Sequence, residues 1–298
     1  MHDGGGPQDG RLQPLGVGEI LDAAVRLYRR SARSLWRIVL IVIVPVAIIE
    51  QLAVAASLPS NAYVSGGSLY TPTGTVGGLG LVVELVLGLL AVLVLNGALA
   101  ICLVDSYIGN PIDWRTSLQA ALARLGPLVW LALLYGALVF IGFVLFVVPG
   151  IYLVTVWCVA IPAVMFEEVG AVGALGRSQR LTRGRWWPTF AALLATIVAL
   201  VIVLFVVGLV FGGIESGLSV GSIGPWLVIG ALGTIVTDLI VYPFIGAVVA
   251  VIYIDLRVRH EELDLGRLAG ALGRPSPPGL PPSWEDVPQR PWDDPPAQ

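Results

Sequence analysis

Long runs of apolar residues alternate with short polar connections along most of this chain. Each run is close to the roughly 20 residues that an α-helix needs to cross the hydrocarbon core of a bilayer. No water is present in that core to satisfy the backbone, so such runs are expected to be helical. The pattern therefore predicts six transmembrane helices, at residues 35–57, 79–104, 127–148, 150–166, 188–212 and 226–254.

Arginine-bearing segments precede the first, third and fifth of these runs. In residues 18–33 the arginines recur at steps of three and four, which places them on one helical face. Tryptophans, among them Trp36, Trp130 and Trp186, stand near the start of each apolar run, as is typical of the polar boundary of a bilayer. The repetition predicts an all-α fold of three units, each an interfacial amphipathic helix followed by a transmembrane hairpin.

The distribution of charge sets the expected orientation. Connection 58–78 and the Pro149–Gly150 turn carry no charge, and connection 213–225 carries only Glu215. The other connections hold the arginines, and arginine-rich connections stay in the cytoplasm. We therefore expect a multi-pass protein of the cell membrane with both termini and all three interfacial helices on the cytoplasmic side.

The amino-acid composition is that of a membrane protein, and its variation along the chain indicates three segments. Apolar residues make up 56% and charged residues 12% of the chain, against about 25% charged in soluble proteins. Residues 15–272 are the predicted membrane domain, while the polar lead 1–14 and the proline-rich acidic tail 273–298 are predicted to be disordered. The lead lacks the basic start and short apolar core of a cleaved signal peptide, so we expect the first helix to remain as an anchor.

The arginines have two interpretations. They can simply fix the orientation of the next helix, or they can bind anionic lipid headgroups at about 1 kcal/mol per arginine. The candidate headgroup-binding residues are Arg26, Arg29, Arg30, Arg33, Arg177, Arg180 and Arg183. Membrane lipids are thus the expected partners. A nucleic-acid partner is not expected, because no separate basic domain is present, and the sequence identifies no protein partner.

A second candidate site lies within the apolar runs, where a charged side chain costs several kcal/mol. Asp238 is near the middle of the sixth run, with Thr234 and Tyr242 four residues away on the same helical face. Glu50 and Glu84 lie toward the outer ends of the first two runs. These residues either couple ion or proton movement or, in the simpler interpretation, hold a neutral carboxyl between helices.

Enzyme signatures are absent from the sequence. The two histidines, His2 and His260, lie outside the apolar runs, and the cysteines Cys102 and Cys158 are isolated within them. A serine nucleophile would have no base within reach, and neither a zinc site nor another cofactor site is expected. We therefore predict a protein without catalytic activity.

Three segments nevertheless resemble the membrane domain associated with glycerophosphoryl diester phosphodiesterases. They begin at Leu15-Gly-Val-Gly-Glu, at Pro149-Gly-Ile-Tyr-Leu and at Tyr253-Ile-Asp-Leu-Arg. The resemblance implies a standalone member of that family, because the chain has no room for the catalytic barrel of the enzymes, and so it carries over no activity. In the last segment, Asp255 and Arg259 are one helical turn apart and are expected to form a structural ion pair.

The sequence thus leaves two functions open. The first is a non-enzymatic membrane protein that binds lipid, organises the membrane or acts as a scaffold through its arginines. The alternative is an ion- or proton-coupled transporter or permease-like protein that uses Asp238.

Overall fold

A computed structural model describes residues 16–58, 63–65, 68–70, 78–110, 113–167, 169–217 and 223–261. In this part of the chain six helical stretches are long and apolar enough to cross a membrane, which confirms the predicted all-α polytopic fold. The expected disordered ends, 1–14 and 273–298, lie outside the described residues. The elements are α1 (Val17–Ser57), β1 (Tyr63–Ser65), β2 (Ser68–Tyr70), α2 (Gly78–Ile108), α3 (Trp114–Ala123), α4 (Leu125–Leu145), α5 (Val147–Val156), α6 (Ala160–Phe166), α7 (Ala171–Thr182), α8 (Trp186–Ser216) and α9 (Ile223–Glu261).

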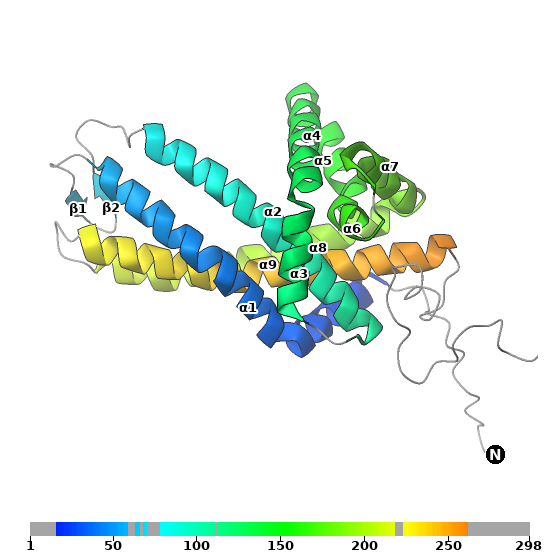
Figure 1. The fold of residues 1–298 in the computed structure, drawn as a ribbon, viewed down its shortest axis with the longest axis horizontal. Helices are drawn as coiled ribbons and strands as arrows, with labels where there is room; N and C mark the ends of the chain where they lie inside the picture. Colours follow the sequence, from blue (N-terminus) through cyan, green and yellow to red (C-terminus); the bar gives the residue numbers. More distant parts are fainter. Residues whose placement is uncertain are drawn as a thin grey trace, which may run out of the picture.

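Helices α1, α2, α8 and α9 pack into one bundle (Figure 1). Its core is apolar, with Leu35, Leu99 and Ile254 among the buried side chains. The start of α1 and the ends of α2 and α9 lie together, opposite the antiparallel pair β1–β2 (Figure 1). We call this the charged end, because it carries the arginines of the first half of α1 and of the last turns of α9.

The first predicted interfacial helix is not a separate element. Residues 18–33 continue without a break into the first apolar run, so that α1 is one helix of 41 residues. No proline interrupts it before Pro45, and a buried stripe that includes Ile20, Ala24 and Leu27 continues to Leu35. At about 1.5 Å per residue α1 is about 60 Å long, twice the thickness of the hydrocarbon core. Helices α3 and α7, by contrast, are separate elements, as expected.

The middle hairpin differs in direction from the rest of the bundle. Helices α4 and α5 stand steeply across α1, α2 and α9 (Figure 1). They turn at Phe146 instead of at Pro149–Gly150, and Pro149 lies in the first turn of α5, where its missing N–H is not needed. A Cβ added to Gly142 would lie 3.2 Å from the Cα of Gly150, so the two glycines allow the close approach of α4 and α5.

The helix expected at 150–166 is interrupted in its middle. It ends at Val156 and resumes as α6 at Ala160. Pro162 has no N–H to donate to the carbonyl of Cys158, and its ring would clash with that carbonyl in a continuous helix. The hydroxyls of Ser178 and Thr182 on α7 donate instead to the carbonyl oxygen of Val156, at 2.7 and 3.3 Å. Helix α7 is thereby fixed to the break.

Candidate functional site

The fold brings together two acidic residues that the sequence could not place relative to each other. Asp238 on α9 is partly buried, and Glu50 on α1 lies within electrostatic range of it. Tyr242, one turn further along α9, is within range of both. An oxygen of Glu50 lies 3.4 Å from the position of a Cβ on Gly88 of α2, so that this glycine leaves room for the carboxylate. A pair of acids in an apolar bundle can share a proton or hold a cation.

The other two residues predicted for this site differ in what the structure describes of them. Thr234 is exposed, and its hydroxyl donates to the carbonyl of Gly230 within its own helix at 3.1 Å. Thr234 keeps its place on the helical face of Asp238 and Tyr242, but its hydroxyl is engaged within α9. The side chain of Glu84 lies outside the described residues.

The arginines of α1 form an exposed row. The apolar face of the same helical turns, with Ala24 and Leu27, is buried in the bundle. Arg29, Arg30 and Arg33 are exposed, and within the described residues none of them makes a hydrogen bond or an ion pair. Arg26 pairs with Asp22, but the two side chains are 66% and 64% exposed, and such a pair contributes little to stability.

Arg177, predicted as a headgroup ligand, is partly buried and is engaged in an internal ion pair. Its side chain is 19% exposed, and Nε donates to Oε2 of Glu167 at 2.5 Å. The other oxygen of Glu167 accepts from the hydroxyl of Tyr253 at 3.0 Å. That hydroxyl also accepts from Arg257, which is 6% exposed, at 3.1 Å. A charged network thus ties the end of α6 and the middle of α7 to the end of α9.

This network was not predicted, although the sequence contains signals for it. Glu167 is an acidic residue at the end of an apolar run, just before an arginine-rich segment, and Tyr253 opens the last segment of the family resemblance. The ion pair expected in that segment is present, with Nε of Arg259 donating to Asp255 at 2.9 Å. These contacts hold the helices of the charged end together, and their burial is typical of a structural role.

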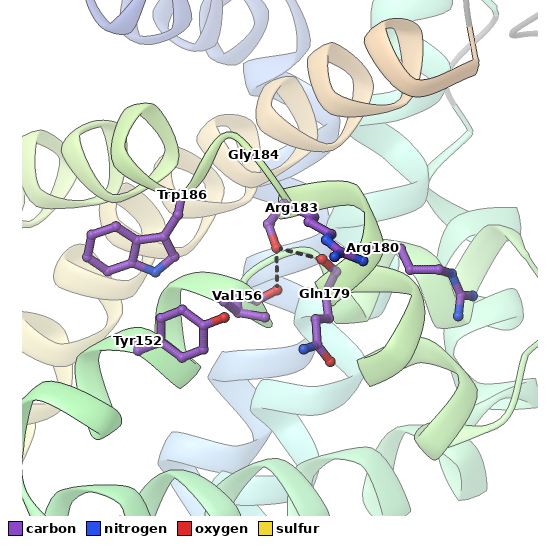
Figure 2. A pocket seen from close by; sticks show the side chains of 8 residues that line it. Tyr152, Val156, Gln179, Arg180, Arg183, Gly184 and Trp186 are labelled. Atoms are coloured by element: carbon purple, nitrogen blue, oxygen red, sulfur yellow. Dashed lines mark hydrogen bonds between the residues drawn. The ribbon is translucent and has the colours of Figure 1, made fainter.

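The remaining predicted arginines, Arg180 and Arg183, are exposed and line a pocket of about 450 Å³. Its walls come from the end of α5, the second half of α7 and the start of α8 (Figure 2). Tyr152 and Gln179 also line it, and neither was predicted. Tyr152 lies on α5, away from the arginine-bearing segment in the sequence, so no local pattern marked it, whereas Gln179 stands beside Arg180 and was readable there.

Within the described residues no group of three or more histidine, cysteine, aspartate or glutamate side chains is arranged to hold a metal ion. Comparisons of the chain with protein-family models, curated proteins and solved structures found no match. The resemblance to the membrane domain of glycerophosphoryl diester phosphodiesterases therefore stays a prediction.

Proposed function

We propose that this is a non-catalytic membrane protein that binds anionic lipids at its charged end and organises the membrane around it. The observation that carries the proposal is the row of Arg29, Arg30 and Arg33. These arginines are exposed on the side of α1 that faces away from the bundle, and within the described residues they make no hydrogen bond or ion pair. Unpaired arginines beside a bilayer attract anionic headgroups. Because arginine-rich ends stay on the cytoplasmic side, we further propose that the charged end and both termini face the cytoplasm.

Because α1 is one continuous helix, the position of each arginine along it gives its distance from the hydrocarbon core. Trp36 is 42% exposed at the start of the apolar run and is placed to lie at the polar boundary. We take Arg37, next to Trp36, as the start of the headgroup layer. Measured along the helix axis, Arg33 lies about 6 Å and Arg26 about 16 Å from Arg37, while the headgroup layer is about 5 to 8 Å thick. In this proposal Arg33 lies within the headgroup layer, Arg30 and Arg29 lie just outside it at about 10 to 12 Å from Arg37, and Arg26 lies farthest from it.

This ranking gives a test with a matched control. Arg33→Gln is expected to weaken binding of phosphatidylglycerol about fivefold, which corresponds to about 1 kcal/mol. Arg26→Gln removes the same charge, but farther from the membrane and already paired with Asp22, so its effect is expected to be smaller than twofold. The measurement is the amount of phosphatidylglycerol retained by the purified protein in nanodiscs of mixed phosphatidylglycerol and phosphatidylcholine. Unchanged retention in Arg33→Gln would contradict the proposal.

A second function, ion- or proton-coupled transport, is supported by the approach of Glu50 to Asp238 between α1 and α9. In this alternative the two carboxyl groups and Tyr242 hold the coupling ion. The site needs an aqueous path, because a dry bundle gives an ion no access to it.

Thiol labelling tests for that path. Asp238→Cys, in a chain with Cys102 and Cys158 replaced by alanine, is treated in intact membranes with a small water-soluble maleimide. Transport predicts labelling at a rate comparable to Tyr63→Cys, whose side chain is 44% exposed in β1. Labelling of Tyr63→Cys alone would rule out the transporter alternative and leave lipid binding as the function.

A further inference from the structure

The pocket between α5, α7 and α8 has two chemically different walls. Figure 2 shows Tyr152 and Trp186 on one side and Gln179 with the two arginines on the other. The rings of Tyr152 and Trp186 stack with centroids 6.1 Å apart and an angle of 22° between their planes. Phe190 also stacks on Trp186, with ring centroids 5.0 Å apart, which helps to fix the indole in place. A flat apolar wall therefore faces a polar, cationic one.

The backbone around the pocket is held in a defined shape. The hydroxyl of Thr182, which also lines the pocket, lies 3.3 Å from the Val156 carbonyl and joins α7 to α5. Gly184 turns the chain from α7 into α8 with a φ of +81°, a value that residues with a Cβ rarely adopt. The arginines flanking this turn are thus carried by a fixed part of the backbone.

The pocket offers hydrogen-bond donors and positive charge without a balancing acid. No aspartate or glutamate lines it, and α8 has neither a side-chain cap at its N-terminus nor an acidic residue in its first turn. The positive end of the helix dipole is therefore uncompensated by the helix itself. The indole Nε1 of Trp186 is buried and, within the described residues, has no hydrogen-bond partner. An unsatisfied buried donor is costly, and an acceptor that reached this N–H through a small movement of the pocket wall on binding would remove that cost.

An apolar track leads away from the pocket along the surface. Val148 and Tyr152 lie one turn apart on α5 and are 76% and 45% exposed. Beside the pocket on α8, Trp187 is 73% exposed. A free phosphate ion would use the cationic wall alone, whereas a phospholipid would use both walls and lay its chains against this track.

We propose that the pocket binds the phosphate headgroup of one anionic phospholipid, held by Arg183 and Gln179 and flanked by Tyr152 and Trp186. The guanidinium of Arg180 extends away from the aromatic wall in Figure 2 and contributes charge at the rim. The inference rests on the proposed function, because it assigns a specific site within the general lipid-binding end. It adds a stoichiometry of one tightly held lipid to the diffuse attraction of the α1 row.

The test is native mass spectrometry of the full chain released from micelles that contain phosphatidylglycerol and phosphatidylcholine. The wild type is expected to keep one phosphatidylglycerol at activation energies that remove the others. Arg183→Gln should lower the fraction with this lipid about tenfold through loss of a charged hydrogen bond. Trp186→Phe, which keeps the stacked ring and removes the N–H, is expected to lower it by a smaller factor, and Arg180→Gln is the matched rim control.

Three outcomes separate the possibilities. If Arg183→Gln keeps the tight lipid, the pocket proposal is overturned, whatever happens at α1. If Arg33→Gln leaves total phosphatidylglycerol unchanged while Arg183→Gln loses the tight lipid, the diffuse function of the α1 row fails and the pocket stands. Displacement of the lipid by glycerol 3-phosphate or inorganic phosphate at millimolar concentration would show that the pocket selects a soluble phosphate, and would overturn its assignment to a lipid.

Discussion

Glu167→Ala is expected to destabilise the protein by about 2 to 3 kcal/mol, because it removes the shared acceptor of two hydrogen bonds in a partly buried ion pair. Glu167 accepts from both Arg177 and Tyr253, and its side chain is only 14% exposed. Its removal takes away the acceptor that these two donors share, and partial burial limits how well water can replace it. The loss also disconnects α7 from the end of α9, because the Tyr253 hydroxyl is the link between Glu167 and Arg257.

Asp22→Ala is the matched control, since it also removes the carboxylate of an arginine pair. The Asp22–Arg26 pair is exposed and spans one helical turn, so its loss is expected to cost about 0.3 to 0.5 kcal/mol. The measurement is thermal or denaturant unfolding of both variants in the same detergent. Glu167→Gln should fall between them, because it keeps an acceptor and loses the charge. Equal stabilities of Glu167→Ala and Asp22→Ala would show that burial does not govern the strength of these pairs.

The sequence predicted the parts of the fold that depend on hydropathy. A run of about 20 apolar residues has only one stable form in a bilayer, so the number of spans followed from counting. Hydropathy does not determine how strongly a helix is tilted, since an apolar helix satisfies its backbone hydrogen bonds at any tilt. The steep angle between the α4–α5 hairpin and the bundle (Figure 1), and the electrostatic proximity of Glu50 to Asp238, depend on packing between distant segments, which no local pattern records.

Other differences had readable causes. Pro162 lies at the position where it removes the hydrogen bond to Cys158, and this marks the break between α5 and α6. On α7 the buried positions include Ala174, Ser178 and Leu181. Arg177 is three residues from Ala174 and four from Leu181, so it stands at the edge of that buried face, whereas Arg180 lies outside it. Once the buried face of α7 is known, helical periodicity therefore distinguishes the partly buried Arg177 from the exposed Arg180.

Removal of both hydroxyls at the break is expected to cost far more than either removal alone. Ser178 donates to the Val156 carbonyl at 2.7 Å, while the N–H of Ala160 donates to Trp157 instead. The Thr182 hydroxyl lies 3.3 Å from the same Val156 carbonyl and 3.0 Å from the carbonyl of Ser178, so it is a second donor that can turn to Val156. Ser178→Ala should cost about 1 kcal/mol, because Thr182 remains as a donor. The double variant Ser178→Ala/Thr182→Val should cost about 3 kcal/mol or more, because it leaves a buried carbonyl without a partner.

Thr196→Val controls for the loss of a buried threonine hydroxyl as such. Thr196 is 4% exposed, and its hydroxyl donates at 2.7 Å to the carbonyl of Ala192, one turn earlier in the same helix. That carbonyl keeps its helical backbone donor, so the variant should cost less than about 1 kcal/mol. The measurement is unfolding in the same detergent of the wild type and of four variants: Ser178→Ala, Thr182→Val, the double variant and Thr196→Val. Additive effects of Ser178→Ala and Thr182→Val would mean that the Val156 carbonyl does not depend on these hydroxyls jointly, and that apolar packing alone fixes α7 to the broken span. A cost well above the sum would establish that the two hydroxyls complete the interrupted helix and thereby set the position of the arginine-lined turn that follows α7.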